Sequence, residues 1–394
     1  MRKALKLLVI FLFIVKPEIT LPQPGALFSW SGMNTALEKA KTENKPLFLM
    51  CYMSWCPHCK NMIDHVLNDP LVIDFYNKHF ICSAQDLEKV EGPYLLNSLK
   101  IKSYPTFIFF DSKGTMIYRI AGELSPDQLV SEGKNALVPE KQLPFLKHQF
   151  DNDTSNSYKC YDYLRALKKG RMDYSTVVRQ YFSTQSDNQL LSEINWKIIS
   201  NGISDINSRE FQFVLSHQKE YSSIASPERV VRKICYLVKE LLNPLVEIKD
   251  TVNYFINRSA AAKIHLYKID SLIFTCDIKL YELTGNWEAY KKVSMESTGT
   301  YVWNDYTQLK DIANVYLKNI PDTTALLQAV KWSKRALSLY EEYGTFLLCS
   351  RLYEKINKIQ DALQMAQQGK NFAKKFGWDY KEAELLLNEL QGKK

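Results

Sequence analysis

After about thirty residues, the chain enters a region in which continuous apolar runs alternate with helix-spaced apolar positions. The run at 47–53 is apolar throughout, which is typical of a strand buried on both faces of a sheet. Asp111-Ser112-Lys113-Gly114 is a hairpin turn signal between two strand-like runs. The alternation, which continues to about Leu137, predicts an α/β domain. The predicted strands are 47–53, 80–84, 106–110 and 115–121, and the predicted helices are 34–41, 56–67, 70–77, 93–99 and a last helix that begins at Ser125-Pro126.

Beyond this region the apolar residues keep helical spacing to the C-terminus, and no hairpin signal appears. The segment 139–157 is polar and contains Pro139 and Pro144, so we expect a linker there. The pattern therefore predicts an α/β domain at 27–138 and an all-α domain at 158–394.

The last third of the chain carries a weak internal repeat. Tyr281, Tyr316 and Tyr353 recur at intervals close to the roughly 34-residue period of tetratricopeptide helix pairs. In the second and third units, each tyrosine precedes two alanines that lie one helical turn apart on the next predicted helix. We expect repeats of this kind, with a generic helical bundle as the alternative.

The N-terminus has the pattern of a secretory signal peptide. Arg2, Lys3 and Lys6 form a positive segment, and the apolar run that begins at Leu7 ends at Lys16. This run is too short to span a bilayer, and a buried N-terminal helix is the alternative. We expect a signal peptide at 1–26, with its cleavage site open, and a periplasmic or secreted protein. No later segment approaches about 18 apolar residues, so we expect no stable membrane span in the mature chain.

Composition narrows the function only a little. Apolar residues make up 46% and charged residues 24%, and the net charge of +8 is spread along the chain. Nucleic-acid binding is not expected, because no basic run is interleaved with aromatic residues. Eight cysteines in 394 residues are too few for a disulfide scaffold. Six of them are dispersed in apolar surroundings and should be buried thiols, namely Cys51, Cys82, Cys160, Cys235, Cys276 and Cys349. Cys51 and Cys82 could touch, and a redox role for Cys51 stays open.

The remaining pair, Cys56 and Cys59, directly follows the predicted buried strand and opens a helix. Thiol–disulfide exchange needs a thiolate, and free backbone N–H groups and the helix dipole stabilise one at a helix N-terminus. Cys59 lies one turn further on, where it can close a disulfide with Cys56. Pro57 suits the first helical turn, and His58 can supply positive charge or a hydrogen-bond donor near the Cys56 thiolate.

A further proline, Pro105, stands at the start of a predicted strand and is a candidate cis peptide. Together with Lys45-Pro46 and the Asp111–Gly114 turn, the segments Trp55-Cys56-Pro57-His58-Cys59-Lys60 and Tyr104-Pro105-Thr106 resemble the thioredoxin superfamily. The lead-in to the first strand and Asp69-Pro70 are closest to its exported bacterial branch, and the helical remainder looks like the C-terminal extensions of such proteins.

The resemblance implies a thioredoxin-like fold, in which helices flank a central mixed sheet. It also implies that Cys56 is the nucleophile, that Cys59 is the resolving thiol, and that the two form the redox disulfide. Pro105 would be the cis-proline that lies beside this disulfide and helps to hold the substrate chain. Trp55, Tyr104 and Thr106 would contact substrate.

One position departs from the family pattern. Thioredoxins usually carry a buried carboxylate six residues before the first cysteine, and here that residue is Met50. The dipeptide Pro57-His58 matches that of the DsbA-type oxidases, which tends to stabilise the reduced form. Reference potentials run from about −270 mV for thioredoxin to about −120 mV for DsbA, and we expect an intermediate to oxidising value.

The sequence therefore predicts a thiol–disulfide oxidoreductase that acts on exported proteins and exchanges electrons with an upstream redox protein. No cofactor and no metal are expected, because a zinc site would need a second ligand pair. The alternative is a helical-repeat protein-binding module whose thioredoxin-like domain is a scaffold or redox sensor. Direction of electron flow, substrates and oligomeric state stay open.

Overall fold

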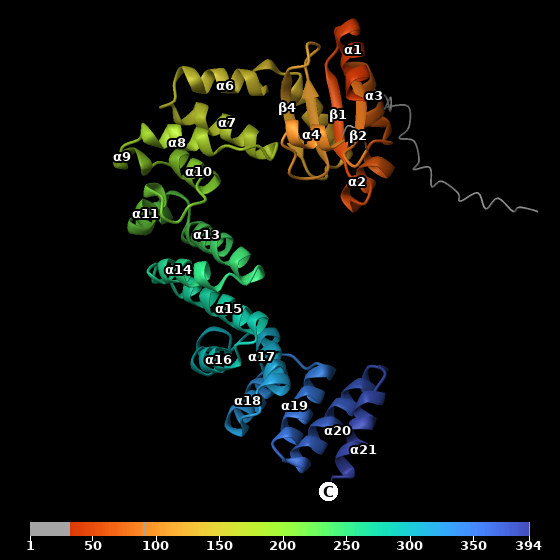
Figure 1. Ribbon diagram of the computed structural model, residues 1–394, viewed down its shortest axis with the longest axis vertical. Coiled ribbons are helices and arrows are strands. Elements are labelled where there is room, and N and C mark those ends of the chain that lie inside the picture. The colour runs from red at the N-terminus through yellow and green to blue at the C-terminus, as the bar shows by residue number, and fades with distance from the viewer. Residues whose placement is uncertain (1–31, 90–91, 394) are drawn as a thin grey trace, which may run out of the picture. The chain divides into compact units, whose positions relative to one another are not determined.

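The computed structural model describes residues 32–89 and 92–393, and it divides into two compact units between Ile203 and Ser204. The first unit holds an α/β domain followed by helices, and the second is built from helices (Figure 1). The predicted signal peptide at 1–26 lies outside the described residues. In the described part, no helix combines the length and apolar character needed to cross a membrane.

A mixed four-stranded sheet forms the centre of the α/β domain. Its strands are β1 (Leu47–Tyr52), β2 (Ile81–Asp86), β3 (Thr106–Phe110) and β4 (Met116–Ala121), in the order β2-β1-β3-β4. β1 and β2 are parallel, whereas β3 is antiparallel to both β1 and β4. All six residues of β1 are buried. This confirms the predicted fold class.

Helices cover both faces of the sheet (Figure 1). Because side chains alternate along a strand, Phe48, Met50 and Tyr52 enter one hydrophobic core and Leu47, Leu49 and Cys51 enter the other. The first core is closed by α2, η1, α3 and α5, and the second by α1 and α4. The helices of this domain are α1 (Met33–Glu43), α2 (Pro57–Asn61), the π-helical turn η1 (Met62–Val66), α3 (Pro70–His79), α4 (Gly92–Ser98) and α5 (Pro126–Ala136).

The helix predicted at 56–67 is not a regular α-helix throughout. After α2 the chain widens into η1, and the Leu67 N–H donates to the Met62 carbonyl five residues back. Asn68 supports this end, because its side-chain amide donates to the carbonyls of Ile63 and Asp64. The extra residue per turn has no signature in the apolar spacing, which is why the sequence predicts one continuous helix.

The segment 139–157, which the sequence assigns to a linker, is mostly helical. Pro139 opens the 3-10 turn η2 (Pro139–Lys141), and Pro144 lies in the first turn of α6 (Leu143–Asn152). Proline is compatible with both positions because the first N–H groups of a helix have no partner within it. Phe150 is fully buried, and α6 packs against β4, so this segment belongs to the fold of the first unit.

The rest of the first unit consists of α7 (Ser157–Lys169), α8 (Ser175–Ser183), α9 (Asp187–Leu190) and α10 (Glu193–Gly202). α7 also packs on β4. Gly170, at its end, lies close to β4, and a Cβ there would make a tight contact at 3.1 Å with the Arg119 backbone oxygen. Lys169 pairs with Glu132 of α5 at 2.5 Å, so charge as well as packing ties these helices to the α/β domain.

The second unit is all-α in its described residues, as the apolar spacing predicts. The three helix pairs α15/α16, α17/α18 and α19/α20 lie where the repeat places them, with Tyr316 near the end of α17 and Ala325 and Ala329 buried in α18. Assignment of the pairs to the tetratricopeptide class stays a prediction. The helices are α11 (Arg209–Ser216), α12 (Gln218–Ile224), α13 (Pro227–Glu247), α14 (Thr251–Ala262), α15 (Tyr267–Thr284), α16 (Trp287–Tyr301), α17 (Tyr306–Asn319), α18 (Thr323–Leu339), α19 (Tyr343–Lys355), α20 (Ile359–Lys375) and α21 (Lys381–Gln391).

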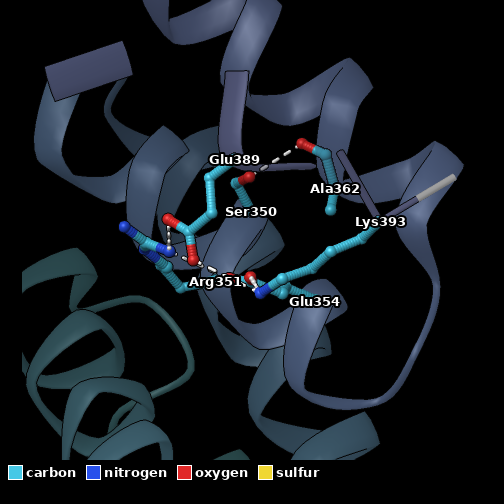
Figure 2. Close-up of polar contacts among 6 residues, drawn as sticks. All are labelled: Ser350, Arg351, Glu354, Ala362, Glu389 and Lys393. Atoms are coloured by element: carbon cyan, nitrogen blue, oxygen red, sulfur yellow. Dashed lines mark hydrogen bonds and ion pairs between the residues drawn. The ribbon is translucent and has the colours of Figure 1, made fainter. Parts of the chain in front are cut away.

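Polar contacts join the last three helices (Figure 2). Arg351 of α19 pairs with Glu354 on its own helix and with Glu389 of α21, at 3.1 and 2.7 Å. Lys393 contacts the same two carboxylates, and the hydroxyl of Ser350 donates to the Ala362 carbonyl of α20. A network of charges fixes the geometry of the C-terminal helices more than isolated surface pairs would.

A buried carboxylate connects α14 and α15. Asp277 is 1% exposed, and it accepts hydrogen bonds from the Tyr254 hydroxyl at 2.7 Å and from the Arg258 guanidinium at 2.7–3.0 Å. A buried charge is tolerated only when it is paired and hydrogen-bonded. Loss of either partner of this pair should therefore destabilise the second unit.

Replacement of Arg258 by methionine leaves the Asp277 carboxylate buried without its cation. We expect the free energy of unfolding to fall by about 2 to 3 kcal/mol, which is below the range for a fully buried pair because the Arg258 side chain is one-third exposed. Chemical denaturation followed by circular dichroism measures this loss. The matched control is Lys279→Met, which breaks an exposed pair with Glu282 and should cost less than about 0.5 kcal/mol; equal losses would contradict the prediction.

Candidate active site

The candidate site forms where β1 ends and α2 begins. Cys56 is the N-cap residue of α2, with extended backbone angles, and its N–H donates to the Met53 carbonyl at 3.2 Å. Pro57 occupies the first helical position. The buried strand therefore delivers Cys56 to a helix N-terminus, as its place in the sequence predicts.

The two cysteine side chains differ in both exposure and contacts. The Cys59 backbone N–H donates to the Cys56 sulfur at 3.4 Å, and the Cys56 thiol lies 3.9 Å from the Tyr104 carbonyl oxygen. Cys56 is 6% exposed and Cys59 is 1% exposed. Both are free thiols in this structure. Cys56 is thus the less buried of the two, and the Cys59 N–H is placed to stabilise the charged form of its sulfur.

Burial raises the pKa of the Cys59 thiol to about 12, and the neighbouring Cys56 side chain adds to this increase. At neutral pH Cys59 therefore keeps its proton until a reaction step removes it. The position that holds the usual family carboxylate is confirmed as apolar, since Met50 is fully buried in the core beneath this helix.

A carboxylate does lie nearby on another strand. Asp86, at the end of β2, is in register with Tyr52 of β1, and both residues are buried. Burial, then Asp86 and then Cys59 raise the pKa of the Tyr52 hydroxyl to about 12. Tyr52 thus interacts electrostatically with both Asp86 and Cys59, although nothing in the local motif around Cys56 indicates Tyr52 or Asp86.

The loop before β3 forms a second wall of the site. The Tyr104–Pro105 peptide bond is cis, as the sequence suggests. Trp55 is 66% exposed and meets the Tyr104 ring edge-on, with 6.3 Å between the ring centroids. Thr106, expected to contact substrate, is fully buried, and its hydroxyl donates to the Ser103 carbonyl at 2.7 Å. Its side chain therefore supports the loop from within, and a contact between Thr106 and substrate stays a prediction.

His58 points to a residue that the sequence analysis missed. Its Nδ1 lies 2.6 Å from the Glu123 carboxylate, and the side-chain amide of Asn61 donates to the other Glu123 oxygen. These two hydrogen bonds lower the pKa of the Glu123 carboxyl, so it is negatively charged at neutral pH. Glu123 lies just beyond β4, far from the cysteines along the chain, and no local signal links it to them.

A second missed carboxylate holds the other side of the turn. Glu88 accepts hydrogen bonds from the Ser54 backbone N–H at 3.0 Å and from the Ser54 hydroxyl at 2.5 Å. The segment that leads into Cys56 is therefore fixed by a residue from beyond β2.

Cys51 and Cys82, which the sequence allowed to touch, lie in different cores on opposite faces of the sheet. The register explains this, because Cys82 is paired with Phe48, whose side chain points away from the face that Cys51 occupies. Burial raises the pKa of each thiol to about 12. Both behave as packing residues.

The fold and the Cys-x-x-Cys turn define a thioredoxin-like domain. A family model for a thioredoxin-like domain matches residues 33–137, so this part of the chain belongs to the thioredoxin superfamily. This confirms the resemblance found in the sequence.

Known proteins also match part of the chain. Protein disulfide-isomerase A5 of Mus musculus is 28% identical over 106 residues, which are 26% of this chain and 20% of that protein. The thiol:disulfide interchange protein DsbD of Pectobacterium atrosepticum is 29% identical over 101 residues, 25% of this chain and 17% of that protein. The solution structure of a thioredoxin from Thermus thermophilus is 23% identical, with a TM-score of 0.27, and the match covers 28% of this chain and 88% of that one. The chain spans a fifth or less of the length of these two curated relatives.

The unequal cysteines predict unequal labelling. When the reduced protein is treated briefly with iodoacetamide at mildly alkaline pH, we expect Cys56 to be alkylated and Cys59 to stay unmodified, because Cys59 is buried and keeps its proton. Peptide mass spectrometry measures both sites. Cys51, which is fully buried, serves as an internal control that should label only after unfolding. Labelling of Cys59 as fast as Cys56 would contradict the geometry.

Proposed function

We propose that the chain is a thiol–disulfide oxidoreductase in which Cys56 attacks and Cys59 resolves. The observation that carries the proposal is the Cys59 N–H donated to the Cys56 sulfur at the N-terminus of α2. It places a hydrogen-bond donor on the Cys56 sulfur, while Cys59, one turn further on, is almost fully buried. Relatives named as a disulfide isomerase and a thiol:disulfide interchange protein, which match about a quarter of this chain, support the proposal.

In the first step, the Cys56 thiolate attacks one sulfur of a substrate disulfide. The substrate S–S bond breaks, a Cys56–substrate S–S bond forms, and the other substrate sulfur leaves as a thiolate. We propose that Trp55 and Tyr104, whose rings meet edge-on, contact the substrate chain, and that Pro105 helps to hold it.

In the second step, Cys59 attacks the Cys56 sulfur. The mixed disulfide breaks, the Cys56–Cys59 disulfide forms, and the Cys59 proton passes to the departing substrate sulfur. The substrate has then gained two electrons and one proton from the enzyme. Its first thiolate takes the second proton from water, which had received the Cys56 proton when the Cys56 thiolate formed. The same steps in reverse oxidise a substrate dithiol, so one site serves either direction according to the redox partner.

We further propose that the substrates are exported proteins and that the helices beyond the α/β domain position a substrate or an upstream redox protein. The N-terminal charge and apolar pattern supports export. The packing of α6 and α7 on β4 supports a joint role for the first unit, because these helices are built onto the domain that carries the cysteines.

A trapping experiment tests the proposal and separates it from a binding module with an inert thioredoxin-like scaffold. In Cys59→Ser, the mixed disulfide cannot be resolved, so we expect disulfide-linked partners to accumulate in the native host. Non-reducing electrophoresis and mass spectrometry identify them and the linking cysteine.

The control is Cys56→Ser/Cys59→Ser, which keeps the fold and every other thiol and should trap nothing. Cys235→Ser/Cys59→Ser tests the half-exposed thiol outside the α/β domain and should trap as much as Cys59→Ser alone. An absence of Cys56-linked species under conditions that retain other mixed disulfides would refute the enzyme and favour the binding module.

A further inference from the structure

A third loop, Gly122–Leu124, converges on the cysteine pair. The Gly122 N–H donates to the Pro105 carbonyl at 2.8 Å, and the Leu124 N–H contacts the Met62 sulfur at 3.4 Å. Gly122 has φ +104°, a backbone conformation that favours glycine. The loop is therefore held at both ends against the other parts of the site, and this holds the Glu123 side chain over α2.

Both oxygens of Glu123 are engaged by α2. One lies 2.6 Å from His58 Nδ1, and the other accepts from Asn61. His58 is the second residue between the two cysteines, so its imidazole is a candidate source of positive charge for the Cys56 thiolate. Glu123 instead occupies one of its two nitrogens and places a negative charge against it.

The sign of the electrostatic effect follows from counting charges. If Glu123 becomes glutamine, one negative charge disappears, and His58 can lose at most one proton in response. The net charge of the two residues therefore rises or stays the same, and it cannot fall. Added positive charge near a thiolate stabilises it, and a more stable thiolate makes the reduced form more stable.

We propose that Glu123 is a positioning residue that withholds His58 from the Cys56 thiolate and so makes the disulfide less oxidising than the Pro57-His58 dipeptide alone predicts. This inference rests on the proposed function, because it concerns the equilibrium of the same cysteine pair. The polar contacts of Glu123 are to His58 and Asn61, and it acts through the imidazole.

Solvent exposure of His58 and Glu123 limits how far Glu123 can change the redox equilibrium. The side chains of His58 and Glu123 are 68% and 37% exposed, so solvent screens their charges. For Glu123→Gln we expect the equilibrium constant with glutathione to shift about tenfold toward the reduced protein, which is about 30 mV for a two-electron couple. In this equilibrium, two glutathione thiols give two electrons and two protons to the Cys56–Cys59 disulfide and leave as glutathione disulfide.

The experiment measures this equilibrium at pH 7 in glutathione buffers for four proteins, namely the unmodified chain, Glu123→Gln, His58→Ala and the double variant. Because Glu123 already counters His58, we expect His58→Ala alone to shift the constant less than about threefold, whereas in the Glu123→Gln background it should reverse most of the tenfold shift. The ultraviolet absorbance of the Cys56 thiolate, titrated against pH, should show a lower Cys56 pKa in Glu123→Gln alone.

The matched control is Asp127→Asn, which removes one exposed carboxylate from the first turn of α5 and should leave the constant within about twofold. Thermal unfolding of each variant checks that the fold persists.

Three results would overturn the proposal. One is an unchanged constant in Glu123→Gln, the second is an equal shift in Asp127→Asn, and the third is a Glu123→Gln shift that persists in the His58→Ala background, since the carboxylate would then act on the thiolate directly. All three leave the proposed function standing. Failure of the unmodified protein to exchange with glutathione at all would refute both.

Discussion

The contact between the Cys59 N–H and the Cys56 sulfur is the interaction on which the chemistry of the first unit depends. It requires a helix N-terminus at the end of a strand, and that strand must be immobile for the helix to stay in place. β1 meets this requirement because its side chains enter two separate cores, one on each face of the sheet. Cys59 is buried in one of these two cores, and this burial raises the pKa of the resolving thiol. Packing and reactivity thus have one physical cause.

The turn that carries the cysteines is also held by charge. Glu88 fixes the backbone before Cys56 through Ser54, and Glu123 fixes the helix after it through His58 and Asn61. Neither carboxylate is buried, so each adds only modest stability. Their value lies in orientation, because a displacement of the Cys56 sulfur by a fraction of an ångström changes which groups can hydrogen-bond to it. A site without the usual buried carboxylate, with Met50 in its place, has therefore gained negative charge at its rim.

The helical part of the chain is stabilised in a different way. In the second unit, neighbouring helices pack through buried tyrosines and small residues. Single polar contacts, such as the 2.6 Å hydrogen bond between the hydroxyls of Tyr316 and Ser294, join one helix pair to the next. The Asp277 group and the Arg351–Lys393 network add charged pairs at two further joints. Each contact joins elements that are close in sequence, which is typical of stacked helix pairs.

The sequence alone determined the order of strands and helices, the buried β1, the reactive turn at Cys56 and the proline that faces it. These features are local, because apolar periodicity, capping and turn residues act within a few positions of one another. Tertiary structure decided the rest. It turned His58 toward Glu123, separated Cys51 from Cys82 by strand register, buried Thr106, and made 139–157 a packed segment. Each of these outcomes depends on residues that are distant along the chain and meet only when the sheet closes, so no local pattern could have indicated them.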